Sequence, residues 1–190
     1  MDILELDRRA SDALGKVVAA VTPEDLRRPT PCADWTLHGL IRHQVCENLG
    51  FAAAASGTPP DRSVWDSGVL GADPHEDFQR SVDLVTEAFA AEGMLERQVE
   101  VREFGVFPGA FAVSMHFIDG VVHGWDAARA LGRPGDLAPD LAEAALEMVL
   151  RMPLSRGPGQ AFGHLVEVPD SASVYQRLAA HLGRDPQWTP

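Results

Sequence analysis

Apolar residues recur at helical spacing along most of this chain, and proline, glycine and small polar residues separate the stretches. The first stretch covers residues 2–21 and ends before Pro23, which begins a short turn. The second starts after Thr36, a residue suited to capping a helix, and stops at Gly57. The pattern therefore predicts two long helices joined by a proline-rich loop.

Two more long helices are predicted in the middle of the chain. Residues 59–72 are rich in Gly, Pro, Asp and Ser, which is typical of a long loop. Asp73 is then a helix N-cap followed by proline, and the third apolar stretch ends near Gly93. Brief alternation over residues 98–109 indicates extended chain, and helical spacing resumes over residues 110–131.

The last third of the chain predicts a smaller unit with both helices and a strand. Helical spacing covers residues 139–152 and 172–182, and the segment 162–168 has the composition of a strand. We therefore predict a mainly α protein. A four-helix bundle is expected over residues 1–132, with a helix-strand-helix extension over residues 133–190 packed on it as a small mixed α/β tail.

Composition and charge narrow the class of protein. With 190 residues, 45% of them hydrophobic, the chain can bury one sizeable core. It has no membrane-length apolar run and no basic N-terminal region followed by an apolar one, so we expect a cytoplasmic protein without a membrane partner. The net charge of −12 and the scattered basic residues disfavour nucleic acid as a partner. Cys32 and Cys46 form no CxxC motif and are expected to be free thiols.

The predicted helix over residues 110–131 carries a stripe of ionisable side chains: His116, Asp119, His123 and Asp126. Asp119 and His123 lie one turn apart, so both side chains can bind the same divalent cation. The alternative is an ordinary solvated face, on which Asp126 pairs with Arg129. His and Asp are poor helix formers for a purely solvated face, which favours the metal site.

The predicted second helix carries a similar pair, His43 and Glu47, one turn apart. This helix carries apolar residues on nearly all of its faces, so we expect it to be buried in the bundle. A buried histidine is commonly a core residue with one hydrogen bond. Metal binding is the alternative when a second helix offers an Asp/His pair, and the spacing leaves both roles open for His43.

Four segments of the chain resemble the DinB-like superfamily. More narrowly, they resemble its mycothiol-dependent maleylpyruvate isomerase N-terminal branch and the actinobacterial metal-binding proteins grouped with it. The segments are TPCADWT at residues 30–36, LIRH at 40–43, DGVVHGWDAARALG at 119–132 and LGRDPQWTP at 182–190. The likeness covers nearly the whole chain. It implies a four-helix bundle that binds a divalent metal, commonly zinc, through His43, Asp119 and His123.

Two features of the chain depart from the family pattern. The isomerase uses Glu where this chain has Asp119. Asp is one methylene shorter and would bring the metal closer to the helix over residues 110–131. The isomerase also has a distinct C-terminal domain, which the short tail here need not reproduce. The fold and the metal ligands therefore transfer better than the reaction does.

The implied ligand set determines which chemistry we expect. Two imidazoles and one carboxylate leave at least one coordination position for substrate or water, as in catalytic zinc sites, and Ni²⁺ or Fe²⁺ accept the same ligands. A thiol in that position would lose its proton near neutral pH. The resemblance then implies a mycothiol-dependent isomerase or S-transferase with a small-molecule substrate. His116 and Glu47 are the expected catalytic residues, with an ordinary, partly exposed histidine as the alternative for His116. Glu47 or Asp126 could orient a metal-bound histidine.

Other interpretations stay open from the sequence. Water in the same position would make the protein a metal-dependent hydrolase or lyase. A filled core with a fourth protein ligand would instead indicate a non-catalytic metal-binding module, whereas an open pocket would favour an enzyme. The assembly is left open between a monomer and a homodimer.

Overall fold

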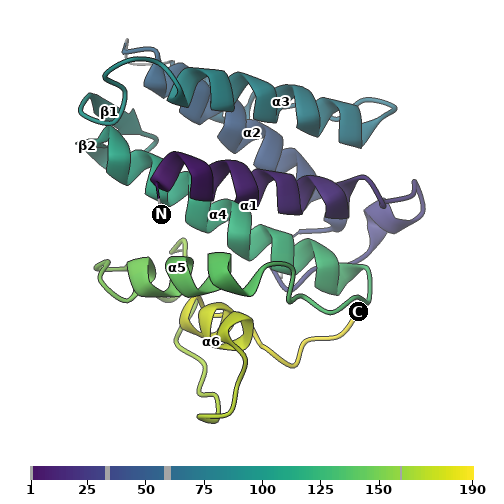
Figure 1. The fold of residues 1–190 in the computed structure, drawn as a ribbon. Helices are drawn as coiled ribbons and strands as arrows, with labels where there is room; N and C mark the ends of the chain where they lie inside the picture. Colours follow the sequence, from purple (N-terminus) through teal and green to yellow (C-terminus); the bar gives the residue numbers. More distant parts are fainter. Residues whose placement is uncertain (1, 33–34, 58–60, 159) are drawn as a thin grey trace.

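The computed structural model describes residues 2–32, 35–57, 61–158 and 160–190 (Figure 1). Ala33 and Asp34 of the first motif, and Pro59 and Pro60 of the predicted long loop, lie outside the described residues. The described elements, with η marking short 3-10 helices, are α1 (Ile3–Val18), η1 (Asp25–Arg27), α2 (Leu37–Ala55), η2 (Arg62–Asp66), α3 (Pro74–Phe89), β1 (Gln98–Val101), β2 (Gly105–Pro108), α4 (Gly109–Ala130), α5 (Pro139–Val149) and α6 (Val174–His181).

Side-chain caps begin the first three long helices. Asp2 accepts a hydrogen bond from a backbone N–H at the start of α1, and Thr36 accepts one from Gly39 at the start of α2. Asp73 accepts from two backbone N–H groups of α3. These bonds satisfy amide groups that have no partner within the helix. The predicted caps Thr36 and Asp73 are confirmed.

The four long helices form two layers. α1 lies beside α4 and α2 lies beside α3, while α5 and α6 stack on the side of α1 and α4 (Figure 1). An apolar core between the long helices includes Leu14, Leu40, Phe78 and Ala127. His116, His123 and Asp126 of the polar stripe of α4 are buried, and Asp119 is partly exposed. The predicted mainly α class is confirmed.

A two-stranded antiparallel sheet lies at one end of the bundle, between α3 and α4 (Figure 1). Val99 pairs with Phe107, and Val101 pairs with Gly105. Arg102, in the turn, has a φ of 41°, a left-handed conformation that costs energy for a residue other than glycine. The predicted extended segment over residues 98–109 is confirmed, and its turn places Arg102 near α2.

The C-terminal segment is helical but lacks the predicted strand. α5 and α6 are present, slightly shorter than predicted, and share an apolar core with α1 and α4. The strand predicted over residues 162–168 is wrong, because among these seven residues Phe162 alone forms a β-bridge, to Arg156. A strand needs a neighbouring strand edge to pair with. Here the amide of Val166 instead donates to the carbonyl of Ala180, at the end of α6.

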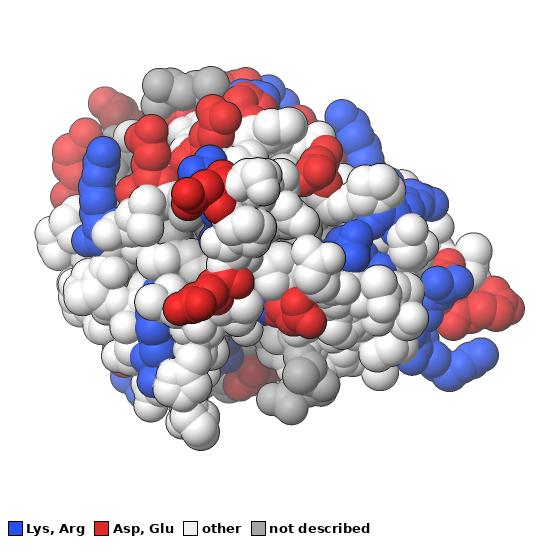
Figure 2. All heavy atoms as spheres, turned by 90° about the horizontal axis from the view of Figure 1, so that it is seen from below, with Lys and Arg blue, Asp and Glu red and all other residues white. Residues whose placement is uncertain are grey.

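The hydropathy of the helices and the charge of the surface bear on whether a membrane or a nucleic acid is a partner. None of the helices in the described residues is long and apolar enough to cross a membrane. On the face drawn in Figure 2, basic and acidic side chains are interspersed with uncharged areas. The expected cytoplasmic location, the expected absence of a nucleic-acid partner and the domain boundary after residue 132 stay predictions.

Candidate metal centre

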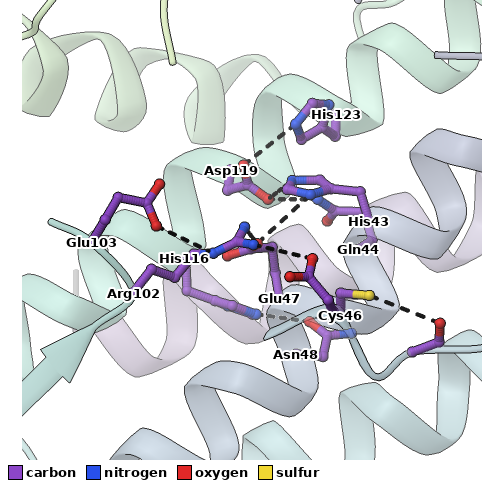
Figure 3. Close-up of polar contacts among 12 residues, drawn as sticks. His43, Gln44, Cys46, Glu47, Asn48, Arg102, Glu103, His116, Asp119 and His123 are labelled. Carbon is purple, nitrogen blue, oxygen red and sulfur yellow. Dashed lines mark hydrogen bonds and ion pairs between the residues drawn. The ribbon is translucent and has the colours of Figure 1, made fainter. Parts of the chain in front are cut away.

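Three side chains from two helices converge inside the bundle. His43 extends from α2, and Asp119 and His123 extend from α4, one turn apart (Figure 3). One ligand atom from each residue lies within 4.8 Å of the other two. The structure therefore brings together the three residues that the sequence resemblance implies as metal ligands, here called the triad.

The spacing of the triad fits a tetrahedral metal ion. Oδ1 of Asp119 lies 3.4 Å from Nε2 of His123, and Oδ2 of Asp119 lies 3.6 Å from Nε2 of His43. Zinc at bond lengths of about 2.0–2.1 Å separates neighbouring tetrahedral ligand atoms by about 3.3 Å. Two imidazoles and one carboxylate are also a usual donor set for zinc. The residues thus fit a divalent cation with a fourth position left for another ligand.

One side of the triad reaches solvent. The side chains of Asp119 and His43 are 29% and 17% exposed, whereas that of His123 is 5% exposed. The ring of Trp35 packs against both imidazoles, with centroid distances of 4.5 Å to His43 and 5.7 Å to His123. The Thr30 hydroxyl donates to backbone carbonyl groups of the loop before α2 and so helps to hold Trp35 there. Solvent therefore reaches the triad at Asp119 and His43.

The members of the triad control one another's ionisation. Burial opposes charge on His123, but the carboxylates of Asp119 and Asp126 raise the pKa of its imidazole to about 9. Burial would likewise raise the pKa of Asp119, but the two imidazoles hold it well below its ordinary value. The pKa of His43 is lowered, chiefly by burial. Without metal, His123 is therefore protonated near neutral pH, and a metal must displace that proton.

A buried amide holds the Asp119 carboxylate. Nε2 of Gln44 donates to Oδ2 of Asp119 at 2.5 Å, and Gln44 is buried (Figure 3). No sequence pattern indicated Gln44 as a site residue. The available signal was a polar residue next to His43 on a helix that is apolar on nearly all sides.

The second ring nitrogen of His123 is held by a buried carboxylate. Nδ1 of His123 lies 2.9 Å from Oδ2 of Asp126, which leaves Nε2 for the metal centre. Arg184, from the segment after α6, donates to the same oxygen at 3.2 Å. The predicted pair of Asp126 with Arg129 is wrong, because Arg129 donates instead to a backbone carbonyl of the C-terminal segment. The arginine that pairs with Asp126 is therefore Arg184, which is distant in the sequence, and not Arg129.

A second carboxylate lies next to the triad. Oε1 of the buried Glu47 is 3.6 Å from Nδ1 of His43, and Arg102 donates to Oε1 at 2.6 Å (Figure 3). Burial and the charge of Asp119 raise the pKa of Glu47 to about 8, against the opposing effect of Arg102. Glu47 therefore exchanges a proton near neutral pH. The structure brings Glu47 to the triad as expected and adds Arg102, which no sequence pattern indicated.

His116 is buried away from solvent and has partners on two other helices. Nδ1 lies 2.6 Å from Oδ1 of Asp7 on α1, and Nε2 lies 2.8 Å from Oδ1 of Asn48 on α2. Asn48 in turn donates to Ser81 on α3 at 2.8 Å. Burial opposes charge on His116, but the Asp7 carboxylate outweighs it and the pKa is raised. This His116 network (Asp7, Asn48, Ser81 and His116) ties the four long helices together, and the alternative of an ordinary, partly exposed histidine is wrong.

Comparisons with known proteins identify one family and two relatives. The family model described as the mycothiol maleylpyruvate isomerase N-terminal domain matches residues 8–128. Two uncharacterized proteins of Mycobacterium tuberculosis, from strains CDC 1551 / Oshkosh and ATCC 25618 / H37Rv, are each 35% identical to this chain over 188 residues. The alignments cover 97% of this chain and 98% of each relative. No solved structure matches. The matched segment includes the triad, but it ends before Arg184.

Proposed function

The chain belongs to the mycothiol maleylpyruvate isomerase N-terminal domain family, and we propose that it is a metal-dependent enzyme that acts with a low-molecular-weight thiol. The observation that carries this proposal is the triad, whose three ligand atoms lie within 4.8 Å of one another in a centre partly open to solvent. The DinB-like four-helix bundle predicted from the sequence is confirmed. The family description makes mycothiol the thiol to test first.

In this proposal His43, Asp119 and His123 hold one divalent cation, with Zn²⁺ favoured and Ni²⁺ or Fe²⁺ compatible. When bound, the cation supplies a Lewis acid that favours the thiolate form of a thiol near neutral pH. The exposed side of Asp119 is the side from which the small-molecule substrate approaches. His123 keeps its Nδ1–H on Asp126, so that Nε2 stays available as a ligand atom.

We assign Glu47 the role of proton acceptor for the thiol. Its carboxylate lies beside His43, and a pKa of about 8 lets it take up and release a proton in the neutral range. Arg102 fixes the carboxylate and adds a positive charge that favours an anionic substrate. His116 was the other expected catalytic residue. Because acceptors occupy both of its ring nitrogens, we assign it to holding the helices together.

The reaction we propose is a thiol-dependent isomerisation or S-transfer. The second candidate is a hydrolase or lyase, because a carboxylate close to the proposed ligand His43 could equally take a proton from water. A non-catalytic metal-binding module is disfavoured, because the ligand cluster found among the described residues has three members and is partly exposed. A homodimer and a cytoplasmic location stay predictions.

Metal analysis of the purified protein tests the proposal. We expect about one divalent ion per chain in the wild type and its loss in His43→Ala and His123→Ala. His38→Ala, at an exposed position of the same helix as His43, is the matched control and should keep the ion. An ion-free wild type, or a triad variant that keeps its ion, would show that the site is wrong.

Cobalt substitution tests the use of a thiol. Mycothiol added to the cobalt-loaded protein should change the visible absorption bands, because sulfur would replace an oxygen ligand. An unchanged spectrum would argue against the thiol and favour the hydrolase or lyase. Glu47→Gln should leave metal content intact and lower the rate of any thiol-dependent turnover by about 100-fold or more.

A further inference from the structure

We infer that Arg184 is a positioning residue of the proposed metal centre: it fixes the Asp126 carboxylate, and Asp126 fixes the orientation of the His123 imidazole. The inference rests on the proposed function, because it concerns how one proposed ligand is held. It extends the centre to the C-terminal segment, beyond the residues 8–128 that the family model matches.

A single carboxylate oxygen connects the three residues. Oδ2 of Asp126 lies 2.9 Å from Nδ1 of His123 and accepts a hydrogen bond from Nη2 of Arg184 at 3.2 Å. Asp126 is 0% exposed and Arg184 is 9% exposed. Because the same oxygen serves both partners, loss of the guanidinium would let the carboxylate rotate away from the imidazole.

Stability alone explains this buried ion pair poorly. Burying a carboxylate and a guanidinium costs solvation energy that their attraction barely offsets. Among the atoms that the structure describes, Oδ1 of Asp126 and Nε of Arg184 are also buried without a hydrogen-bond partner. A pair kept only for stability would satisfy these atoms or give way to apolar residues. The contact with His123 supplies a reason to keep the charges.

The turn after α6 directs Arg184 into the bundle. Gly183 has a φ of +83°, and a Cβ added there would lie 2.5 Å from Cα of Gly163, so only glycine fits. The backbone N–H of Arg184 then donates to the carbonyl of Ala179 at 2.9 Å. Nη1 of Arg184 donates to the carbonyl of Leu182 at 3.2 Å. The backbone and the guanidinium are therefore both held in place for the contact with Asp126.

The orientation of His123 matters because of which nitrogen it presents. With Nδ1–H committed to Asp126, the neutral imidazole keeps its lone pair on Nε2, the atom 3.4 Å from Asp119. A ring that rotates or changes tautomer would present this lone pair only part of the time. Loss of such an outer partner weakens metal binding by about 10- to 100-fold, so we expect this loss of zinc affinity in Arg184→Met.

The test compares Arg184→Met with Arg129→Met in the full-length protein. Arg129 also holds the C-terminal segment, through the carbonyl of Trp188, so its variant controls for a loosened tail. Zinc dissociation constants are measured by competition with a chromophoric chelator. Proton and ¹⁵N NMR of the metal-free protein follow the hydrogen-bonded Nδ1–H of His123. We expect weaker zinc binding and a shifted Nδ1–H signal in Arg184→Met, and wild-type behaviour in Arg129→Met.

The outcomes separate this inference from the proposed function. An unchanged His123 signal in Arg184→Met, or an equal loss in Arg129→Met, overturns the inference even if the wild type binds zinc. A shifted signal specific to Arg184→Met in a protein that binds no zinc supports the positioning role and refutes the proposed function. If the Arg184→Met variant does not fold, the double variant Arg184→Met/Asp126→Asn replaces it, because it removes both charges of the buried ion pair. Wild-type zinc affinity in that double variant overturns the inference.

Discussion

Two clusters that include the polar stripe of α4 both place histidine beside aspartate, but they differ in whether their atoms satisfy one another. In the His116 network, both ring nitrogens meet acceptors, at 2.6 and 2.8 Å. In the triad, Asp119 lies 3.4 and 3.6 Å from the nearest nitrogens of His123 and His43. These distances exceed the roughly 2.7–2.9 Å of a charge-assisted hydrogen bond between such groups.

The difference teaches how to separate a structural histidine from a ligand. The triad is partly exposed and its ligand atoms are spaced for an ion between them, whereas the buried His116 network is closed. Each cluster contains a histidine from the same stripe of α4. Exposure and the partners of each ring nitrogen distinguish the clusters, and variants should therefore affect stability in one cluster and metal binding in the other.

Removing the carboxylate from the His116 network should have the largest effect. Asp7→Ala leaves His116 buried without its charged partner, which typically costs about 3–5 kcal/mol of unfolding free energy. Urea denaturation of the metal-free protein measures this loss. Asp12→Ala, on the same helix but in an exposed ion pair, should cost less than about 1 kcal/mol. Similar losses in the two variants would show that the His116 network does not stabilise the fold.

Zinc should stabilise the protein only through the triad. At zinc concentrations about 1,000 times the dissociation constant, the unfolding free energy should rise by about 4 kcal/mol. Under conditions in which the Asp7→Ala variant is folded, it should keep this gain in unfolding free energy. The His43→Ala variant should lose it. Denaturation with and without zinc measures both. An equal gain in His43→Ala would place the zinc outside the triad and remove the contrast between the two clusters.

The sequence was sufficient for the features that depend on local order. Thr36 and Asp73 begin helices because a capping side chain acts on amides two or three residues away. Asp119 and His123 share a face because helical spacing alone dictates it. The strand over residues 162–168 failed for the opposite reason, since extended chain forms a strand only where another strand edge is available.

The two arginines of the site could not be predicted from local order. Arg102 reaches Glu47 from a turn with a left-handed φ, and Arg184 reaches Asp126 through a turn that Gly183 allows. Both contacts depend on how segments far apart in the chain pack together. The expected pair of Asp126 with a residue three positions away shows the same limit, because a tertiary partner displaced the local one.

Raising the pH should strengthen zinc binding and lower the stability of the metal-free protein. Zinc displaces the proton of His123, whose pKa is about 9, so zinc affinity should rise about tenfold per pH unit between pH 7 and 9 and then level off. In the metal-free protein, the raised pKa of His123 contributes stability that is complete below pH 6.5 and lost as the pH rises through about 9. The pKa of Glu47, raised to about 8, likewise makes the metal-free protein less stable as the pH rises. Chelator competition and urea denaturation at each pH measure the two trends, and a flat affinity from pH 7 to 9 would contradict them.

Lengthening the triad carboxylate should have the smallest effect. Asp119→Glu supplies the ligand that the isomerase uses, but its extra methylene pushes the carboxylate toward α2, where it crowds the amide of Gln44. We expect zinc binding to persist and to weaken by about five- to tenfold, or roughly 1 kcal/mol. Asp7→Glu is the matched change in the His116 network, where overpacking should cost about 1–3 kcal/mol of unfolding free energy. Tighter zinc binding in Asp119→Glu would mean that the triad must contract when it takes up the ion, and that its 3.4 and 3.6 Å spacings are not those of the loaded site.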